Sequence, residues 1–138
     1  MNERRKPNAM LIELVIVILF FAISASIILQ LFVAAHDRSV QSDVENTAVL
    51  TAEDIVERFA ASSLGADAFF EDLGWIEEPN GYGLQTSVDG HTLRLVSTGS
   101  TEDTTAGTLD DLTLTIYDSD REVVSLPMVR YTPKEDTP

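Results

Sequence analysis

The stretch LIELVIVILFFAISASIILQLFVAA, Leu11 to Ala35, is apolar almost throughout and contains neither proline nor glycine. A helix that crosses a membrane needs about 20 such residues, at roughly 1.5 Å of rise each. The stretch is therefore long enough to span a bilayer. One carboxylate, Glu13, lies near its start. Because a charge at the bilayer centre costs about 2.5–3.5 kcal/mol, and still has a cost near the end of a span, membrane anchoring alone does not explain Glu13.

Charge is distributed unevenly on the two sides of this stretch. Three basic residues, Arg4, Arg5 and Lys6, precede it, whereas most acidic residues follow it and bring the formal net charge to −14 over 138 residues. Because basic flanks stay in the cytoplasm, we expect a single-pass membrane protein with a cytoplasmic N-terminus and an acidic extracytoplasmic domain. An acidic domain argues against direct nucleic-acid binding, which needs Lys and Arg to neutralise phosphates. The length suits one small domain and its anchor.

Three interpretations of the apolar stretch are open. A cleaved secretory signal has a basic start and an apolar region of about 7–15 residues, shorter than the one present, although Val33-Ala34-Ala35 offers small residues for a signal peptidase. A plain single-pass anchor fits the length but leaves Glu13 unexplained. The third interpretation, a filament subunit, rests on a resemblance in the N-terminal motif.

The segment RRKPNAMLIELVIVILFFAI resembles the N-terminus of type IV pilins and pseudopilins. That family has a short basic leader, then Gly, an aromatic and a polar residue, and then Leu-Ile-Glu-Leu-Val at the start of a long apolar helix. Leu11–Val15 matches this last motif residue for residue. The three preceding positions differ, since Asn8 stands in place of Gly, Ala9 in place of the aromatic residue and Met10 in place of the usual Thr.

The resemblance implies a processing step and a mode of assembly. A prepilin peptidase would cut between Asn8 and Ala9, and Ala9 would become the N-methylated first residue. Glu13, then the fifth residue, would pair with the N-terminal amine of a neighbouring subunit. The implied partners are identical or related pilin-like subunits, the peptidase, and the assembly machinery of a pilus or secretion system. A buried ion pair of this kind can specify register, because leaving either charge alone is costly.

The function implied is that of a structural subunit. The filament would be a type IV pilus-like fibre at the bacterial cell surface, or a pseudopilus of type II secretion or competence. The alternative is a membrane-anchored extracytoplasmic binding module that never polymerises. Ala22 and Ser26 form a small-xxx-small pair on one helix face, which would allow close helix packing in lipid or in a filament.

Beyond the membrane the helix is expected to continue. Residues 36–62 contain no Gly or Pro, and apolar residues recur at close to helical spacing from Val40 to Phe59. We place the helix end near Ser63–Gly65, with Gly65 as the C-cap. The predicted organisation is a leader over 1–8, a membrane-spanning or filament-core helix over 9–35, its amphipathic continuation over 36–64, a β-rich head over 65–133 and a tail over 134–138. The predicted fold class is α+β, with the long N-terminal helix packed on a small antiparallel sheet.

The rest of the chain is typical of strands. Asp89-Gly90 separates two alternating runs and predicts a hairpin turn. A second hairpin is expected to turn at 118–121, with Leu112, Leu114 and Ile116 on one face. Pro127 indicates an edge or bulged strand, because it lacks an N–H to donate. The segments 66–79 and 97–111 are predicted as a mixed connection and as a mobile polar loop.

Catalytic chemistry finds little support. There is no Cys, and His36 and His91 lack metal-site partners. Neither a Gly-x-Ser-x-Gly elbow nor a phosphate-binding loop is present, so we expect no enzyme and no cofactor. The acidic loop is a candidate Ca²⁺ site, against the alternative of solvated charge; its carboxylates are Glu102, Asp103, Asp110 and Asp111. Asp118-x-Asp120-x-Glu122 begins like an EF-hand loop, but Val123 and Val129 occupy the positions that need Gly and Glu.

Overall fold

The computed structural model describes residues 6–88 and 90–134, with side chains from residue 8 onward. Its elements are α1 (Lys6–Ala61), α2 (Ala66–Asp72), β1 (Ile76–Glu78), β2 (Gly81–Val88), β3 (His91–Asp103), β4 (Gly107–Asp118) and β5 (Arg121–Pro133). The chain divides into two compact units between Gln41 and Ser42. The predicted α+β class, a long N-terminal helix and an antiparallel sheet, is confirmed.

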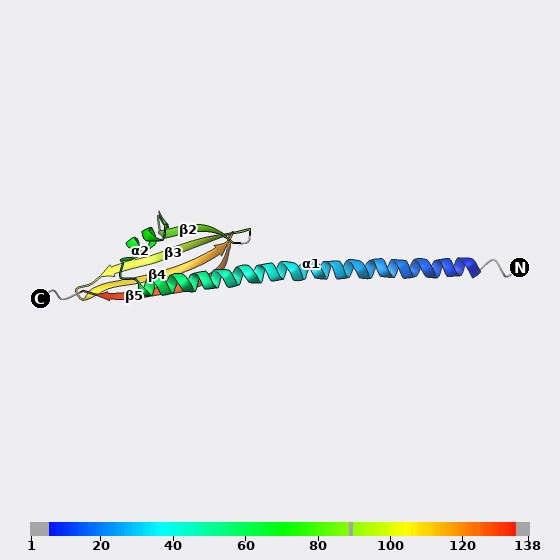
Figure 1. Cartoon of the computed structure of the whole chain (residues 1–138), viewed down its shortest axis with the longest axis horizontal. Coiled ribbons are helices and arrows are strands. Elements are labelled where there is room, and N and C mark those ends of the chain that lie inside the picture. The colour runs from blue at the N-terminus through cyan, green and yellow to red at the C-terminus, as the bar shows by residue number, and fades with distance from the viewer. Residues whose placement is uncertain (1–5, 89, 135–138) are drawn as a thin grey trace. The chain divides into compact units, whose positions relative to one another are not determined.

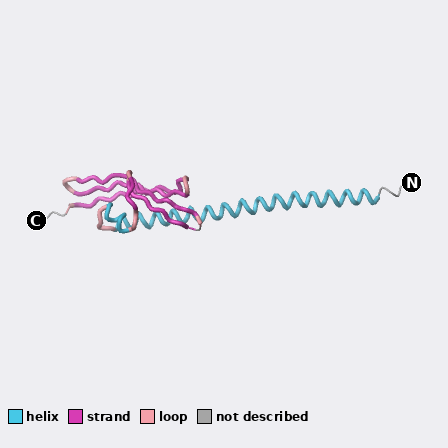
Figure 2. The backbone as a smooth tube through the Cα atoms, turned by 90° about the horizontal axis from the view of Figure 1, so that it is seen from above, coloured by secondary structure: helices cyan, strands magenta, loops and turns pink. Residues whose placement is uncertain are grey.

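The second unit contains one five-stranded antiparallel sheet with the strands in chain order, β1-β2-β3-β4-β5 (Figure 1). Each strand therefore pairs with the next through a hairpin, and the tube in Figure 2 shows the short connections between them. Val88 pairs with His91 and Asp118 with Arg121, so both predicted hairpins are present. Asp89 itself lies outside the described residues.

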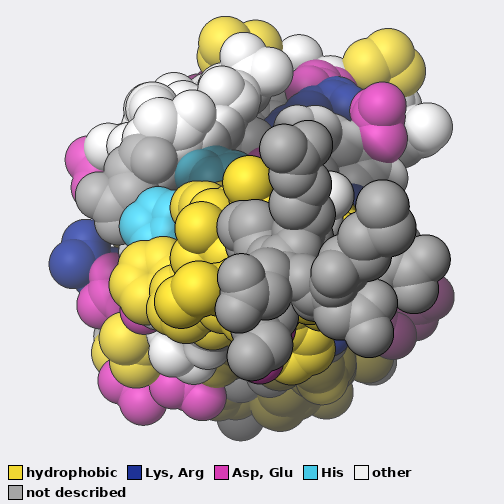
Figure 3. All heavy atoms as spheres, turned by 90° about the vertical axis from the view of Figure 1, so that its right-hand side faces the viewer, with side chains coloured by type: hydrophobic (Ala, Val, Ile, Leu, Met, Phe, Trp, Pro, Cys, Tyr) yellow, Lys and Arg dark blue, Asp and Glu magenta, His cyan; other side chains and the backbone are white. Residues whose placement is uncertain are grey.

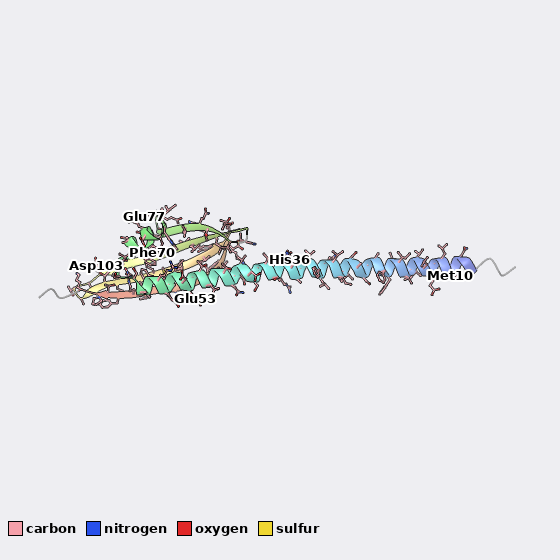
Figure 4. The ribbon with its side chains drawn as sticks, in the orientation of Figure 1. Met10, His36, Glu53, Phe70, Glu77 and Asp103 are labelled. Carbon is pink, nitrogen blue, oxygen red and sulfur yellow. The ribbon has the colours of Figure 1, made fainter. Side chains whose placement is uncertain are left out.

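The last turns of α1 supply one side of the core of this unit. Val44, Ala48, Ala52, Ile55 and Phe59 are buried at helical spacing, whereas Glu53, labelled in Figure 4, is exposed. The sheet covers them with residues that alternate along its strands: Leu93 and Leu95 on β3, Leu112, Leu114 and Ile116 on β4, and Met128 on β5. The amphipathic helix and the inward face of β4 are thus as predicted. Burial of an aliphatic or aromatic side chain stabilises the fold by about 1.5–3 kcal/mol.

The segment after α1 is more regular than predicted. Gly65 has an extended backbone, φ −60° and ψ 161°, and is the N-cap of α2, so its assignment as a C-cap is wrong and α1 ends earlier, at Ala61. Phe69 and Phe70 on α2 are buried, and the Phe70 ring stacks on Tyr82 of β2 at 4.9 Å between centroids. A two-turn helix is hard to predict because its helical signal is short, and aromatic packing here fixes it.

The predicted mobile loop over 97–111 is wrong. Strands β3 and β4 continue through it, with pairs running from Ser97–Leu114 to Asp103–Thr108. A tight turn then closes the hairpin, in which the N–H of Thr104 donates to the carbonyl of Gly107 at 2.8 Å and the N–H of Gly107 donates to Thr104 Oγ1 at 3.1 Å. Polar, Gly-containing composition indicated a loop, but the Thr residues in it suit a strand with one solvated face.

Pro127 lies on β5, which is an edge strand of the sheet, as predicted. The register between β4 and β5 shifts at Ile116/Tyr117, a β-bulge close to the hairpin turn. A proline is tolerated at an edge because its missing N–H can face away from the neighbouring strand.

Candidate functional site

The first unit presents an apolar helical surface that nothing else in that unit covers. Large side chains of α1 from Met10 to Val33 are more than half exposed, among them Phe20 at 70%, Phe21 at 74% and Phe32 at 77%. Hydrophobic side chains are visible on the face shown in Figure 3, the side from which α1 begins. A soluble monomer rarely exposes a contiguous apolar patch of more than a few hundred Å², so a surface of this kind indicates a lipid or protein environment.

Within the described residues, one helix is long and apolar enough to cross a membrane, and it is α1. No residue of its most apolar window is buried inside the unit. A core helix of a soluble protein would be mostly covered by its own fold, so this observation favours an outside environment for the helix. A signal sequence near an N-terminus would meet the same criteria of length and composition.

Glu13 lies within an apolar stripe of this helix. Met10 precedes Glu13 by three residues and Val17 follows it by four, and Leu14 is likewise four residues from Met10 and three from Val17. Together with Leu11 these residues line a shallow hollow beside the carboxylate. Residues at these spacings share one helix face. Within the described residues Glu13 has no hydrogen-bond or ion-pair partner, so its carboxylate is available to a group outside the chain. A bare carboxylate at an apolar contact would favour a cationic partner.

The other predicted positions of this unit lie along the same helix. Asn8 and Ala9 are exposed in the first turns of α1, whereas Arg4 and Arg5 of the basic flank lie outside the described residues. Ser26 Oγ donates to the carbonyl oxygen of Ala22 at 2.9 Å, so its hydroxyl is satisfied within the helix. The Ala22–Ser26 face therefore offers small side chains without an unpaired polar atom to desolvate.

In the second unit, sequence reasoning missed a buried arginine. Arg130 on β5 pairs with Asp110 on β4, with 2.8 Å between Nη2 and Oδ2, and the two side chains are only 9% and 2% exposed. The same guanidinium donates to the main-chain oxygens of Phe59, Ser62 and Leu64, at 3.0, 2.9 and 2.7 Å. Its Cζ lies 4.1 Å from the centre of the Phe59 ring.

These contacts explain how the end of α1 is joined to the sheet. The last carbonyls of a helix lack intrahelical partners and carry the negative end of its dipole. Arg130 satisfies one carbonyl of α1 and two of the segment that follows it, while Asp110 balances the buried charge. Thr101 donates a further hydrogen bond to Asp110 at 2.8 Å. The cluster is structural in character, because every one of its donors is directed at the fold itself.

The acidic residues predicted as a candidate Ca²⁺ site do not form a metal-binding cluster in the structure. Asp110 is occupied by Arg130 and Thr101, and Asp103 accepts a hydrogen bond from Thr108 at 2.6 Å. Among residues 6–88 and 90–134, no group of three or more His, Asp or Glu side chains has a metal-binding arrangement. Of the histidines, His36 is exposed and His91 Nδ1 lies 3.4 Å from Asp118 Oδ2.

A second polar contact missed by sequence reasoning links α2 to the sheet. The hydroxyl of Tyr82 on β2 donates to Asp67 Oδ1 on α2 at 2.7 Å. This hydrogen bond, together with partial burial and the charge of Asp67, raises the pKa of Tyr82 from 10.0 to about 12. The phenol therefore stays protonated and keeps donating throughout the physiological range.

We expect the Asp67→Asn substitution to lower the pKa of Tyr82 part of the way toward 10, because the amide oxygen accepts a weaker hydrogen bond than the carboxylate and carries no charge. Since the native pKa lies above that of the unfolded chain, the contribution of Tyr82 to stability is complete below pH 10 and is lost as the pH rises toward 12. Titration of the Tyr82 ring by NMR measures the shift. An unchanged midpoint in the variant would show that Asp67 is not its cause.

Comparison of the chain with protein-family models, with curated proteins and with solved structures found no match.

Proposed function

We propose that this protein is a membrane-anchored structural subunit that assembles through α1 into a type IV pilus-like or pseudopilus filament. The observation that carries the proposal is the uncovered apolar surface of α1 with Glu13 as its one carboxylate between Met10 and Val33. Lipid would cover the apolar side chains before assembly, and the helices of other subunits would cover them afterwards. The Leu11–Val15 motif supports this family of filaments over other assemblies.

Assembly gives Glu13 a physical role that anchoring does not. In lipid, the carboxylate lies near one end of the span, where its cost is reduced. In a filament, the positive N-terminal amine of a neighbouring subunit would reach it across the apolar stripe of Met10, Leu14 and Val17. The pair would fix the axial register of one subunit on the next, because a register shift would leave two charges unpaired in an apolar core.

The second unit would be the part that the filament displays. Its sheet, its α2 helix and the end of α1 share one core, and Arg130 joins the sheet to the end of α1 and the segment that follows it. Like and related subunits, a prepilin peptidase and a membrane assembly machinery are the partners that the proposal requires. The proposed function requires no catalytic group.

Protease accessibility tests the membrane orientation that the proposal needs. Treatment of intact spheroplasts should degrade the acidic unit from Ser42 onward, whereas the membrane-embedded part of α1 should be protected, because the basic flank stays in the cytoplasm. A cytoplasmic protein serves as the control for spheroplast integrity. Protection of the acidic unit until the cells are lysed would contradict the orientation.

A disulfide test addresses assembly itself, since the chain has no native cysteine. Ser26→Cys places a thiol on the small-residue face of α1, and we expect oxidation to give a covalent dimer in the membrane or filament fraction. Glu53→Cys, on an exposed face of the same helix in the second unit, is the matched control and should dimerise far less. A monomeric anchor, the alternative function, predicts little covalent dimer for either variant, and none when the protein is diluted in detergent before oxidation.

We predict that cleavage before Ala9 is slow, because a peptidase site fitted to Gly must accommodate the side chain of Asn8. Asn8→Gly should speed the loss of the leader, which pulse-chase labelling followed by gel mobility would record. Asn2→Gly, which alters the same residue type away from the cleavage position, is the control. Equal and complete processing of the unchanged chain and of Asn8→Gly would show that the side chain at this position is not limiting.

A further inference from the structure

A cleft in the second unit lies outside everything that the proposed assembly uses. Its inner part has a volume of about 210 Å³ and lies between α2 and the sheet, with Asp67, Phe70, Tyr82, Ser97, Gly99 and Thr101 in its lining. An outer part of about 460 Å³ shares Asp67, Tyr82 and the two glycines Gly81 and Gly99, and adds Glu77 and Glu78. Figure 4 labels Phe70 and Glu77, one from each part.

The inner part contains a polar group without a partner. Ser97 is 1% exposed, and its hydroxyl has no hydrogen-bond partner within the described part of the chain. Ser97 pairs with Tyr82 across the β2–β3 ladder, so the two side chains lie on the same face of the sheet, the face on which the cleft opens. A buried hydroxyl left unpaired costs about 1–3 kcal/mol, which a bound hydrogen-bonding group would relieve.

Every charged residue that lines the two parts is acidic. Glu78 is already engaged by Arg94 at 2.8 Å, which leaves Asp67 and Glu77 without a cationic partner in the described residues. Asp67 Oδ1 accepts from Tyr82, so its second oxygen is open. The rings of Phe70 and Tyr82, stacked on one another at 4.9 Å between centroids, add an apolar surface to the lining.

We propose that this cleft binds an alkylammonium group, with the ammonium between Asp67 and the Ser97 hydroxyl and the alkyl chain along Phe70 and Tyr82. An ammonium supplies three donors and no acceptor, which matches a carboxylate oxygen and a hydroxyl lone pair. The inner volume is below the range of about 300–1,000 Å³ typical of drug-sized ligands, so it suits a short amine or the end of a lysine side chain. Glu77 in the outer part raises the concentration of cations at the entrance of the inner part.

The test uses the full chain in detergent micelles, with n-butylammonium chloride as the probe and amide NMR shifts of α2 and β3 as the readout. We expect saturable binding with a dissociation constant of about 1 mM, and no saturable binding of 1-butanol or butyrate, which have the same chain length but no positive charge. Binding of Nα-acetyl-lysine methylamide as well would assign the ligand to a protein side chain. Binding of butylammonium alone would assign it to a free amine.

Two variants identify the residues responsible. Asp67→Asn keeps an acceptor for Tyr82 and should weaken binding by tenfold or more, as expected for loss of a charge-assisted hydrogen bond. Ser97→Ala removes an unsatisfied hydroxyl, so it should weaken binding without lowering the unfolding midpoint. Glu102→Gln, an exposed carboxylate outside the lining, is the control and should change nothing. Absence of saturable binding, or equal binding by Asp67→Asn and the unchanged chain, would overturn the proposal.

Discussion

Replacing Arg130 with methionine is expected to lower the free energy of unfolding of the second unit by about 3–5 kcal/mol, the usual cost of removing one partner of a buried ion pair. The substitution leaves Asp110 buried at 2% exposure with Thr101 as its remaining donor. It also removes the guanidinium that donates to the carbonyls of Ser62 and Leu64. The Phe59 carbonyl loses one of two donors, because the N–H of Ser62 also donates to it at 3.2 Å. Methionine preserves much of the apolar stem of the arginine side chain, so the loss of stability measures the contribution of the guanidinium.

Urea unfolding of the full chain in detergent measures this loss through Trp75, which is the single tryptophan of the sequence and is 6% exposed in the second unit. Arg121→Met is the matched control, because Arg121 pairs with Glu45 at 2.9 Å but both side chains are nearly half exposed. An exposed pair contributes about 0–1 kcal/mol. Equal losses for the two variants would contradict the role given to Arg130.

A double substitution separates the charge from the packing. Adding Asp110→Leu to Arg130→Met removes the unpaired carboxylate, and replacement of a buried pair by apolar residues is often neutral or stabilising. We therefore expect the double variant to recover part of the loss. The part of the stability that is not recovered measures the hydrogen bonds that Arg130 donated to the main chain at and after the end of α1.

The second large effect is expected at Glu13. Glu13→Leu removes the one carboxylate of the apolar surface, so the helix should insert into the membrane at least as well as before. In a filament, the same change would leave the N-terminal amine of a neighbouring subunit desolvated and unpaired, at a cost of about 3–5 kcal/mol. Filament assembly should therefore fall by two orders of magnitude or more, while the amount of protein in the membrane is unchanged.

Quantitative immunoblots of the membrane fraction and of sheared surface filaments measure the two amounts. Glu13→Asp should assemble at an intermediate level, because it keeps the charge but is one methylene shorter. Glu53→Leu removes an exposed carboxylate elsewhere on α1 and is the control. Normal assembly of Glu13→Leu would remove the main reason to prefer a filament subunit over a simple anchor.

Residue patterns predicted the large elements because their signals are long. The apolar run and the spacing of Val44, Ala48, Ala52 and Phe59 predict one helix with two different environments, and α1 has this form. Alternation of Leu112, Leu114 and Ile116 likewise gives the inward face of β4. Periodicity over many residues is the strongest local signal that a sequence carries.

The same alternation contains a signal for a buried ion pair. Asp110 continues the inward series of Leu112 and Leu114 by two residues, and Arg130 continues that of Leu126 and Met128. Two opposite charges at inward positions of neighbouring strands indicate a buried pair. The interpretation of 97–111 as a polar loop hid this, because it placed Asp110 outside any strand.

The contacts of α2 could not be predicted in this way. Its seven residues are too few for a helical period, and its place is set by the packing of Phe70 against Phe59 of α1 and Tyr82 of β2, which belong to other elements. The unpartnered Ser97 hydroxyl is similarly a property of the assembled sheet. Glu13 was accessible to sequence reasoning because a charge in an apolar run is conspicuous by composition alone.

Mass spectrometry of the N-terminus of the protein recovered from the membrane and from sheared filaments tests the central claim most directly. A filament subunit predicts a chain that begins at Ala9, with a methyl group on its amine and Glu13 as the fifth residue. A chain that begins at His36 would show that α1 supplies a cleaved signal, and a chain that keeps Arg4, Arg5 and Lys6 in both fractions would show an unprocessed anchor. Either of these last two results would contradict the account.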